Sequence, residues 1–397
     1  MQLTSPAFRP LLLNTLSYYS NFIFLGLVSA SLGPALPYLA ENTQSSIEAI
    51  SILFAARSFG YLLGALGGGR LYDSIPGHRL MIISLIIMAV ALWFTPLAKT
   101  LILLAIIMML VGATESVVDI GGNTLLIWLH REKVGPFMNG LHFSFGIGAF
   151  LIPLIIDASR RYFGSPAQAF YLLALLVIPL MMSLWLRPTP QNRSQNLEST
   201  ERQPQDIWLI ILFASFFFFY AGTEISYGNW VYTYALEQNL ATEQGAALIN
   251  SLFWGAFTLG RLFGIPIAFR FKVKQIISSN IILGLLVVFI LALFPQSVPL
   301  LWLGSILFGI AIASTFPCMM SFAQEHIHME GRITGFFFTG VSIGAMLIPW
   351  LIGQFFERYS PSAMMVIILL ALLLTGLIFW LILKRQAKTK NLLLPNQ

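Results

Sequence analysis

The chain has 397 residues, of which 57% are hydrophobic, 14% aromatic and only 10% charged, and its mean hydropathy is +0.81. Soluble globular proteins carry about 25% charged residues, so this composition excludes a soluble protein and indicates an integral membrane protein. The net charge of +6 does not indicate a nucleic-acid partner, because the basic residues lie singly between apolar runs rather than in a patch.

Twelve apolar runs follow one another along the chain, each long enough to cross a bilayer as a helix of about 20 residues. We expect helices at 11–39, 47–72, 80–98, 101–129, 137–157, 167–186, 207–236, 245–270, 275–294, 298–322, 333–356 and 361–383. The first run is longer than the apolar part of a cleavable signal peptide, so we expect the N-terminus to be retained.

The stretch 187–206 is rich in Pro, Gln, Asn and charged residues, which predicts a flexible cytoplasmic linker. It divides the chain into an N-terminal half, 1–186, and a C-terminal half with a short cytoplasmic tail, 207–397. Each half contains six of the apolar runs. The single cysteine, Cys318, offers neither a disulfide framework nor metal-ligand spacing, so no metal or cofactor is expected.

The basic residues predict the orientation of the protein in the membrane. With a cytoplasmic N-terminus, 16 of the 22 Lys and Arg residues lie in cytoplasmic loops, in the linker or in the tails, and four lie outside. Positive residues mark the cytoplasmic side, so both termini are expected inside. We expect a monomeric, multi-pass protein of a plasma membrane, such as the bacterial inner membrane.

The second half repeats sequences of the first. Residues 146–155 (GIGAFLIPLI) are similar to residues 342–351 (SIGAMLIPWL), and 51–64 share Ser, Gly and Leu positions with 251–264 at an offset of 200. These offsets predict a duplicated six-helix unit; chance similarity between apolar helices is the alternative. The predicted fold is an all-α integral membrane protein with two pseudo-symmetric six-helix halves, which place a solute site between them and expose it alternately to each side.

A few charged residues lie inside the predicted helices, where each costs at least about 2.5–3.5 kcal/mol unless it faces a partner or a watery cavity. In the fourth run Glu115, Asp119 and Asn123 are spaced four residues apart and share one helix face. We interpret Asp119 as a carboxylate that binds a coupling cation, with Glu115 as a second candidate. Arg57 of the second run is expected either to form a structural ion pair with these carboxylates or to hold Asp119 ionised.

Other polar side chains interrupt the fifth, seventh and eighth runs. Residues 219–232 (FYAGTEISYGNWVY) alternate polar, aromatic and small side chains, a composition that suits a sugar. His142 is a further candidate, although a lone histidine can simply donate a hydrogen bond to a neighbouring helix. Arg261 is expected to snorkel or to close an inner gate. The residues expected to line the solute path are Glu224, Tyr227, Asn229, Trp230, Asn250 and Trp254.

Together these features resemble the major facilitator superfamily, and the resemblance covers nearly the whole chain. Residues 69–79 (GRLYDSIPGHR) are similar to the loop motif that follows the second helix in that family, with Ser74 in place of a basic residue. By this resemblance Asp73 is expected to stabilise one conformation and so to act in gating.

Within the superfamily, three stretches are similar to the sodium-dependent glucose transporter branch and to the related fucose–proton symporters. They are Leu32–Leu36 (LGPAL), Asp119–Asn123 (DIGGN) and the segment 219–230. Phe316-Pro317 is similar to a helix kink of the fucose group. The resemblance implies cation-coupled sugar transport, with Asp119 as the coupling carboxylate and Asn123 as a sugar-binding amide.

The leading hypothesis is therefore a proton- or sodium-coupled monosaccharide symporter that works by alternating access, with a small solute and the lipid bilayer as its only partners. The alternative within transport is an exporter of amphipathic or drug-like solutes by proton antiport, because the 33 Phe and 14 Met residues could line an apolar cavity. An intramembrane aspartyl protease would need paired aspartates, whereas Asp119 is the only one expected inside a span. A receptor or scaffold without transport is the remaining alternative.

Overall fold

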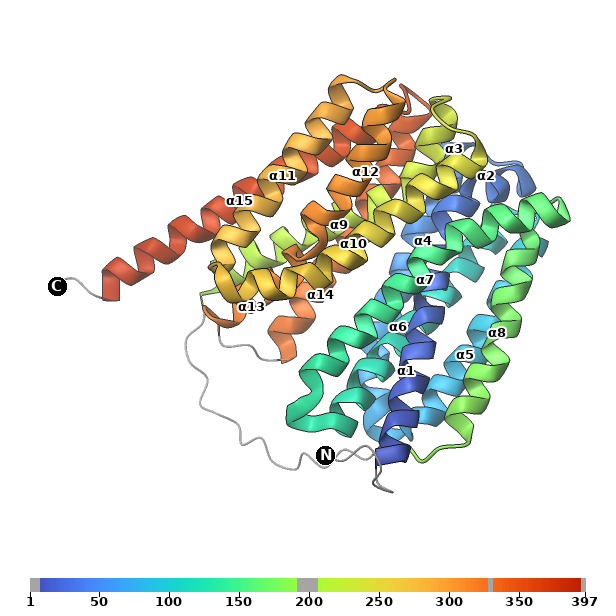
Figure 1. The fold of residues 1–397 in the computed structure, drawn as a ribbon, viewed down its shortest axis with the longest axis horizontal. Helices are drawn as coiled ribbons and strands as arrows, with labels where there is room; N and C mark the ends of the chain where they lie inside the picture. The colour runs from blue at the N-terminus through green and yellow to red at the C-terminus, as the bar shows by residue number, and fades with distance from the viewer. Residues whose placement is uncertain (1–7, 191–205, 328–330, 394–397) are drawn as a thin grey trace.

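The computed structural model describes residues 8–190, 206–327 and 331–393. Within these ranges the chain consists of helices joined by short turns, without strands, and twelve helical segments are long and apolar enough to cross a membrane (Figure 1). This confirms the predicted fold class. Most of the predicted linker, 187–206, lies outside the described residues.

The bounds of the helices lie within six residues of the predicted ones, except that α15 ends at Leu393, ten residues after the predicted end at 383. They are α1 Phe8–Ser29, α2 Leu32–Asn42, α3 Ile47–Ile50, α4 Ile52–Ser74, α5 Gly77–Phe94, η1 Thr95–Leu97, α6 Leu101–His130, η2 Arg131–Lys133, α7 Val134–Phe163, α8 Ala167–Trp185, α9 Ile207–Glu237, α10 Glu243–Arg270, α11 Val273–Leu293, α12 Val298–Ala313, α13 Thr315–Gln324, α14 Gly331–Phe356 and α15 Ala363–Leu393.

Three runs predicted as continuous helices are interrupted. The first run divides into α1 and α2, the second into α3 and α4, and the tenth into α12 and α13. In the tenth run Pro317 follows the break and has no backbone N–H to donate to the carbonyl of Ala313. The Nε atom of Arg261 lies 3.4 Å from that carbonyl oxygen instead, so a side chain from α10 satisfies the interrupted backbone.

The two halves are packed in the same way. In the first half α1 packs on α7 and α4 on α6, and in the second α9 packs on α14 and α10 on α12. A Cβ atom on Gly148 would lie 1.9 Å from the carbonyl oxygen of Ile23, and one on Gly344 would lie 1.9 Å from that of Phe218. The repeated glycines therefore bring equivalent helix backbones together, which is the pseudo-symmetry that the repeat predicts.

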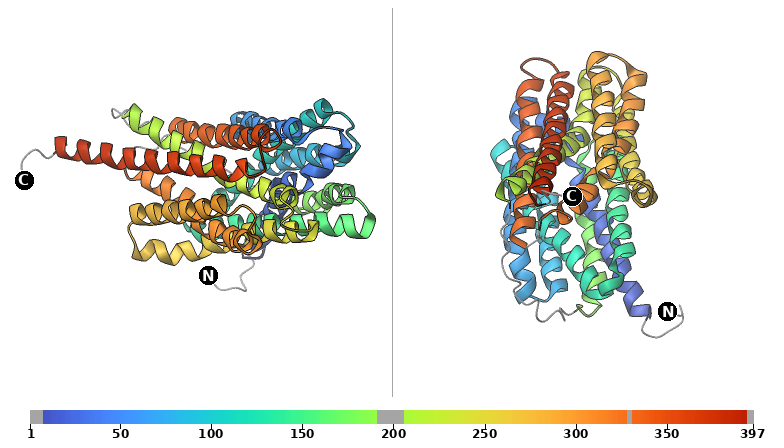
Figure 2. Two further views of the ribbon diagram at one scale, coloured as in Figure 1. Left: turned by 90° about the horizontal axis from the view of Figure 1, so that it is seen from above. Right: turned by 90° about the vertical axis from the view of Figure 1, so that its left-hand side faces the viewer.

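The halves meet mainly at the end of the bundle opposite the two termini. The bundles converge near α2, α3 and the start of α10 and diverge toward the end where both termini lie (Figure 1), and α15 extends past the bundle at the diverging end (Figure 2). At the converging end Arg160 of α7 pairs with Glu243 of α10, and the backbone N–H of Glu48 donates to Glu357 at 2.9 Å. The halves are thus joined at one end and separated at the other.

Candidate functional site

A cavity of about 240 Å³ lies between the halves, beside the first half of α4 and the middle of α6. Side chains of both halves line it, and among the described lining residues all the charged ones come from the first half. The polar lining residues are Ser29, Arg57, Ser58, Tyr61, Glu115 and Asp119 from the first half and Asn229, Trp254 and Ser342 from the second. The remaining lining residues are apolar. The cavity therefore has one charged wall and one neutral wall.

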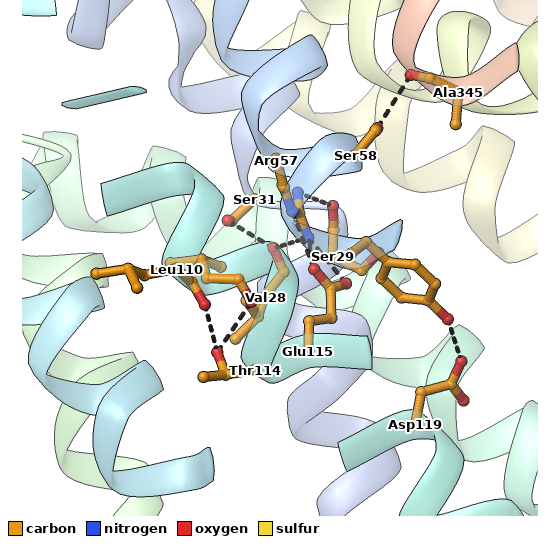
Figure 3. Close-up of polar contacts among 12 residues, drawn as sticks. Val28, Ser29, Ser31, Arg57, Ser58, Leu110, Thr114, Glu115, Asp119 and Ala345 are labelled. Atoms are coloured by element: carbon orange, nitrogen blue, oxygen red, sulfur yellow. Dashed lines mark hydrogen bonds and ion pairs between the residues drawn. The ribbon is translucent and has the colours of Figure 1, made fainter. Parts of the chain in front are cut away.

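Arg57 of α4 and Glu115 of α6 form a bidentate pair in the charged wall (Figure 3). The Nε atom of Arg57 lies 3.0 Å from Oε2 of Glu115, and Nη2 lies 2.9 Å from Oε1. Nη1 and Nη2 also donate to the carbonyl oxygens of Ser29 (2.7 Å) and Val28 (3.1 Å) at the interrupted end of α1, where the Val28 carbonyl accepts from the Ser31 hydroxyl as well. The side chains are only 11% and 6% exposed, so the pair is buried, neutral overall and held on every side.

Asp119 lies one helical turn further along α6 and has different partners. The hydroxyl group of Tyr61 donates to Oδ2 at 2.5 Å, and Nδ2 of Asn123 donates to Oδ1 at 2.9 Å. Arg57 pairs with Glu115 rather than with Asp119, which matches the structural ion pair, one of the two roles expected for this arginine. Two neutral donors therefore hold the Asp119 carboxylate, while Glu115 is fully engaged with an arginine.

The neutral wall offers two buried polar atoms without hydrogen-bond partners among the described residues. Asn229 donates from Nδ2 to the Ile225 carbonyl at 2.9 Å, but its Oδ1 atom has no partner, and neither has Nε1 of Trp254. Both residues are 7% exposed. A buried polar atom left unpaired costs about 1–3 kcal/mol. The residues of this wall thus hold one unpaired acceptor and one unpaired donor beside the cavity.

Three residues predicted for the solute path lie instead within the packing of the second half. The hydroxyl group of Tyr227 bonds to that of Ser305 at 2.8 Å, and Nε1 of Trp230 donates to the Pro349 carbonyl at 3.0 Å. Asn250 donates to a backbone carbonyl of α9 at 2.5 Å. All three are fully buried and outside the cavity lining. The composition of a helix does not tell which face each of its side chains occupies.

Four further candidates also lie outside the cavity lining. Asn123 supports Asp119 rather than facing the cavity. Arg261 and Glu224 face each other, with Nη2 and Oε1 3.9 Å apart, and His142 is exposed on α7 with its ring edge-on to Phe22. The expected gating role of Arg261 and the path-lining roles of Glu224 and His142 stay predictions.

Two further aspartates, Asp73 and Asp157, lie on helices of the first half. The side chain of Asp73, the other predicted gating residue, lies outside the described residues. Asp157 is the last residue of the predicted fifth helix, but α7 continues to Phe163, and Asp157 is buried within it, where it pairs with Arg160 at 3.2 Å and Arg161 at 2.9 Å. It belongs to the closed end of the bundle and is paired with two arginines rather than with a second aspartate.

Four polar lining residues were not expected from the sequence: Tyr61, Ser29, Ser58 and Ser342. Of these, Tyr61 hydrogen-bonds to Asp119. A tyrosine in an apolar run is ordinarily a packing or interface residue, which hides a polar role. The signal that could have found it is its spacing from Arg57: the two are four residues apart on α4, as Glu115 and Asp119 are on α6. The matching spacing places two contacts, Arg57–Glu115 and Tyr61–Asp119, one above the other between the same two helices.

The comparison with known proteins agrees with this architecture. The chain matches the model of the Major Facilitator Superfamily over residues 18–349. It is 33% identical to sodium-dependent glucose transporter 1A of Mus musculus, over 84% of this chain and 88% of that protein, and 31% identical to sodium-dependent glucose transporter 1 of Homo sapiens, over 91% and 77%. A solved structure of a variant of the nucleoside transporter NupG has the same fold, with a TM-score of 0.75 at 16% identity over 94% of this chain and 99% of that one. The chain therefore belongs to the Major Facilitator Superfamily.

Proposed function

We propose that this transporter couples the uptake of a monosaccharide to a cation, a proton or sodium, by alternating access. The observation that carries the proposal is the two-sided cavity, with the Asp119 carboxylate in one wall and the unpaired groups of Asn229 and Trp254 in the other. A carboxylate can take up a cation, and neutral donors and acceptors beside an aromatic ring match the hydroxyl groups and the apolar face of a sugar. The relatives named sodium-dependent glucose transporters support both parts.

The size of the cavity favours a small solute over a drug-like one. Its volume of about 240 Å³ lies below the range of roughly 300–1,000 Å³ that is usual for pockets of drug-sized ligands. Its lining also includes a buried ion pair and a carboxylate, a polar environment to which an amphipathic solute could offer few hydrogen bonds. These features support the sugar symporter over the exporter of amphipathic solutes.

The positions of the halves support a rocking mechanism. Parallel six-helix repeats expose a central site by moving as two bodies, and here the halves touch mainly at the end opposite the termini. With the termini on the cytoplasmic side, as the basic residues favour, this arrangement is inward-facing. The Arg160–Glu243 pair would then close the outer end and break when the transporter turns outward.

Uptake by proteoliposomes tests this function. Labelled D-glucose is expected to accumulate above its external concentration when an inward proton gradient or an inward sodium gradient is imposed, and unlabelled glucose should compete better than its C4 epimer. Hydrophobic cations serve as the second class of solute. Extrusion of those cations in exchange for protons, without accumulation of glucose, would favour the exporter instead.

Replacing Trp254 by phenylalanine is expected to raise the half-saturation concentration for glucose about tenfold. The substitution keeps an aromatic ring but removes the Nε1–H donor, and a lost hydrogen bond worth about 1.4 kcal/mol corresponds to a factor of ten. Trp302→Phe in α12, outside the cavity lining, is the matched control and should keep the wild-type value. An unchanged half-saturation concentration in Trp254→Phe would remove this indole from the sugar site.

A further inference from the structure

The two contacts between α4 and α6 differ in their freedom to change. Arg57 meets Glu115 through charged groups, and the Arg57 donors that face away from Glu115 bind the backbone carbonyls of Val28 and Ser29. Tyr61 meets Asp119 through one hydroxyl group, which can rotate about its C–O bond. If Arg57 or Glu115 changed its partner, the other would be left as a buried, unpaired charge, which is costly. The Tyr61 hydroxyl is therefore the adjustable part of this wall.

Among the described residues, the Asp119 carboxylate is hydrogen-bonded by neutral groups rather than paired with a basic side chain. On α4 the groups facing it are Tyr61 and Arg57, and Arg57 is paired with Glu115. The Tyr72 hydroxyl, further along α4, donates to the Val117 carbonyl at 2.8 Å instead. On α6 the facing groups are Glu115 and Asn123. The described cavity-lining side chains of the second half are all uncharged. The ionised state of Asp119 thus depends on hydrogen bonds from Tyr61 and Asn123.

Tyr61 is also the donor that touches both the carboxylate and the space for the solute. It lines the cavity beside Asp119, whereas Asn123 lies outside the lining and spends its second N–H on the Asp119 backbone carbonyl, at 2.9 Å. A sugar in the cavity brings hydroxyl oxygens to the Tyr61 side chain, and these compete with Asp119 for its single proton. Occupation of the cavity can therefore change the surroundings of the carboxylate without any movement of α6.

We propose that Tyr61 is the positioning residue that couples the sugar to the cation. In the empty cavity its hydroxyl donates to Asp119 and stabilises the bare carboxylate; when a sugar binds, the hydroxyl turns to a sugar oxygen, and Asp119 then binds the coupling cation more tightly. Hydrogen bonds to the charged form of a carboxylate favour that form, so loss of the donor favours neutralisation. By reciprocity the cation must tighten sugar binding by the same factor. This inference rests on the proposed symport function.

Calorimetric titration of D-glucose into purified protein tests the coupling. In the wild type, supplying the coupling cation (protons or sodium, each varied separately) is expected to lower the glucose Kd by at least about fivefold, the lower end of common coupling factors. Tyr61→Phe should bind glucose more weakly. Its glucose Kd should also change by less than about twofold with the cation, because the variant lacks the hydroxyl group that sugar and carboxylate share. Tyr72→Phe, a tyrosine of the same helix bonded to a backbone carbonyl, should keep the wild-type cation effect.

The outcomes separate this proposal from the proposed function. A full cation effect in Tyr61→Phe overturns the role of Tyr61 while leaving symport in place, whereas a wild-type Kd that responds to neither cation overturns both. The cation effect itself is the readout that a merely structural role would not move. If Tyr61 only shaped the cavity, Tyr61→Phe would weaken glucose binding by the same factor with and without the cation, and the cation effect of the wild type would remain.

Discussion

Proteoliposomes that contain the Asp119→Asn variant are expected to take up D-glucose only until the internal and external concentrations are equal, whatever cation gradient is imposed. Asparagine keeps the shape of the side chain, and its oxygen can still accept the hydrogen bond from Tyr61. It carries no charge for a cation to neutralise. A buried, uncompensated charge is costly inside the membrane, so the ionised Asp119 opposes closure of the site until a cation binds. In the variant the residue is always neutral, and the halves can therefore rock without the cation.

The same vesicles distinguish lost coupling from lost transport. Counterflow of labelled glucose against unlabelled glucose needs only movement of the loaded site, so we expect it to continue in Asp119→Asn. Asp206→Asn is the control: Asp206 precedes α9 outside the spans, where its carboxylate bonds to Arg385 at 2.6 and 2.8 Å, and this variant should accumulate glucose as the wild type does. Accumulation in Asp119→Asn at the wild-type level would remove Asp119 from coupling.

Breaking the Arg57–Glu115 pair from one side is expected to destabilise the protein more than removing both charges. Loss of one partner of a buried pair costs about 3–5 kcal/mol, because it leaves the other charge buried and uncompensated. Arg57→Gln should have the largest effect, since Arg57 also serves the carbonyl groups at the end of α1. The double variant Arg57→Gln/Glu115→Gln leaves no unpaired charge and should recover part of the loss.

Thermal unfolding of the purified variants measures this order. We expect the melting temperature to fall from the wild type to the double variant, then to Glu115→Gln and finally to Arg57→Gln. The comparison is a double-mutant cycle, in which residues in direct contact deviate from additivity. A double variant whose loss equals the sum of the two single losses would show that the pair does not interact as its bidentate geometry implies.

The spans and the two halves could be predicted because a bilayer imposes local rules. Each helix needs its own long apolar run, and the duplicated unit leaves an offset that sequence comparison detects, as residues 146–155 and 342–351 show. The interruption between α1 and α2 could not be predicted from apolar runs, and the one between α12 and α13 was indicated only by the resemblance of Phe316-Pro317 to a helix kink. They depend on side chains such as Arg57 and Arg261, which reach the broken backbone from neighbouring helices.

The candidate site was predicted less completely, because its geometry depends on how the helices are rotated and staggered. Asp119 and Glu115 differ by one turn of α6, about 5.4 Å, and only the stagger of α4 against α6 decides which of them meets Arg57. On α9 neighbouring residues point about 100° apart, so Asn229 faces the cavity while Trp230 packs against Pro349 and Phe356. A sequence pattern gives these residues but not the direction in which each one points.

Protection of a cysteine in the cavity wall tests the central claim, that the sugar lies between Asp119 and Trp254, most directly. Cys318 is the only native cysteine, so Ser342→Cys in a Cys318→Ala background places one thiol in the lining. D-glucose at ten times its Kd leaves roughly a tenth of the sites free, and it should slow maleimide labelling about tenfold by this mass action. Ser279→Cys, exposed on α11, should react at the same rate with and without glucose. Labelling of Ser342→Cys at an unchanged rate, in protein that still transports glucose, would contradict the account.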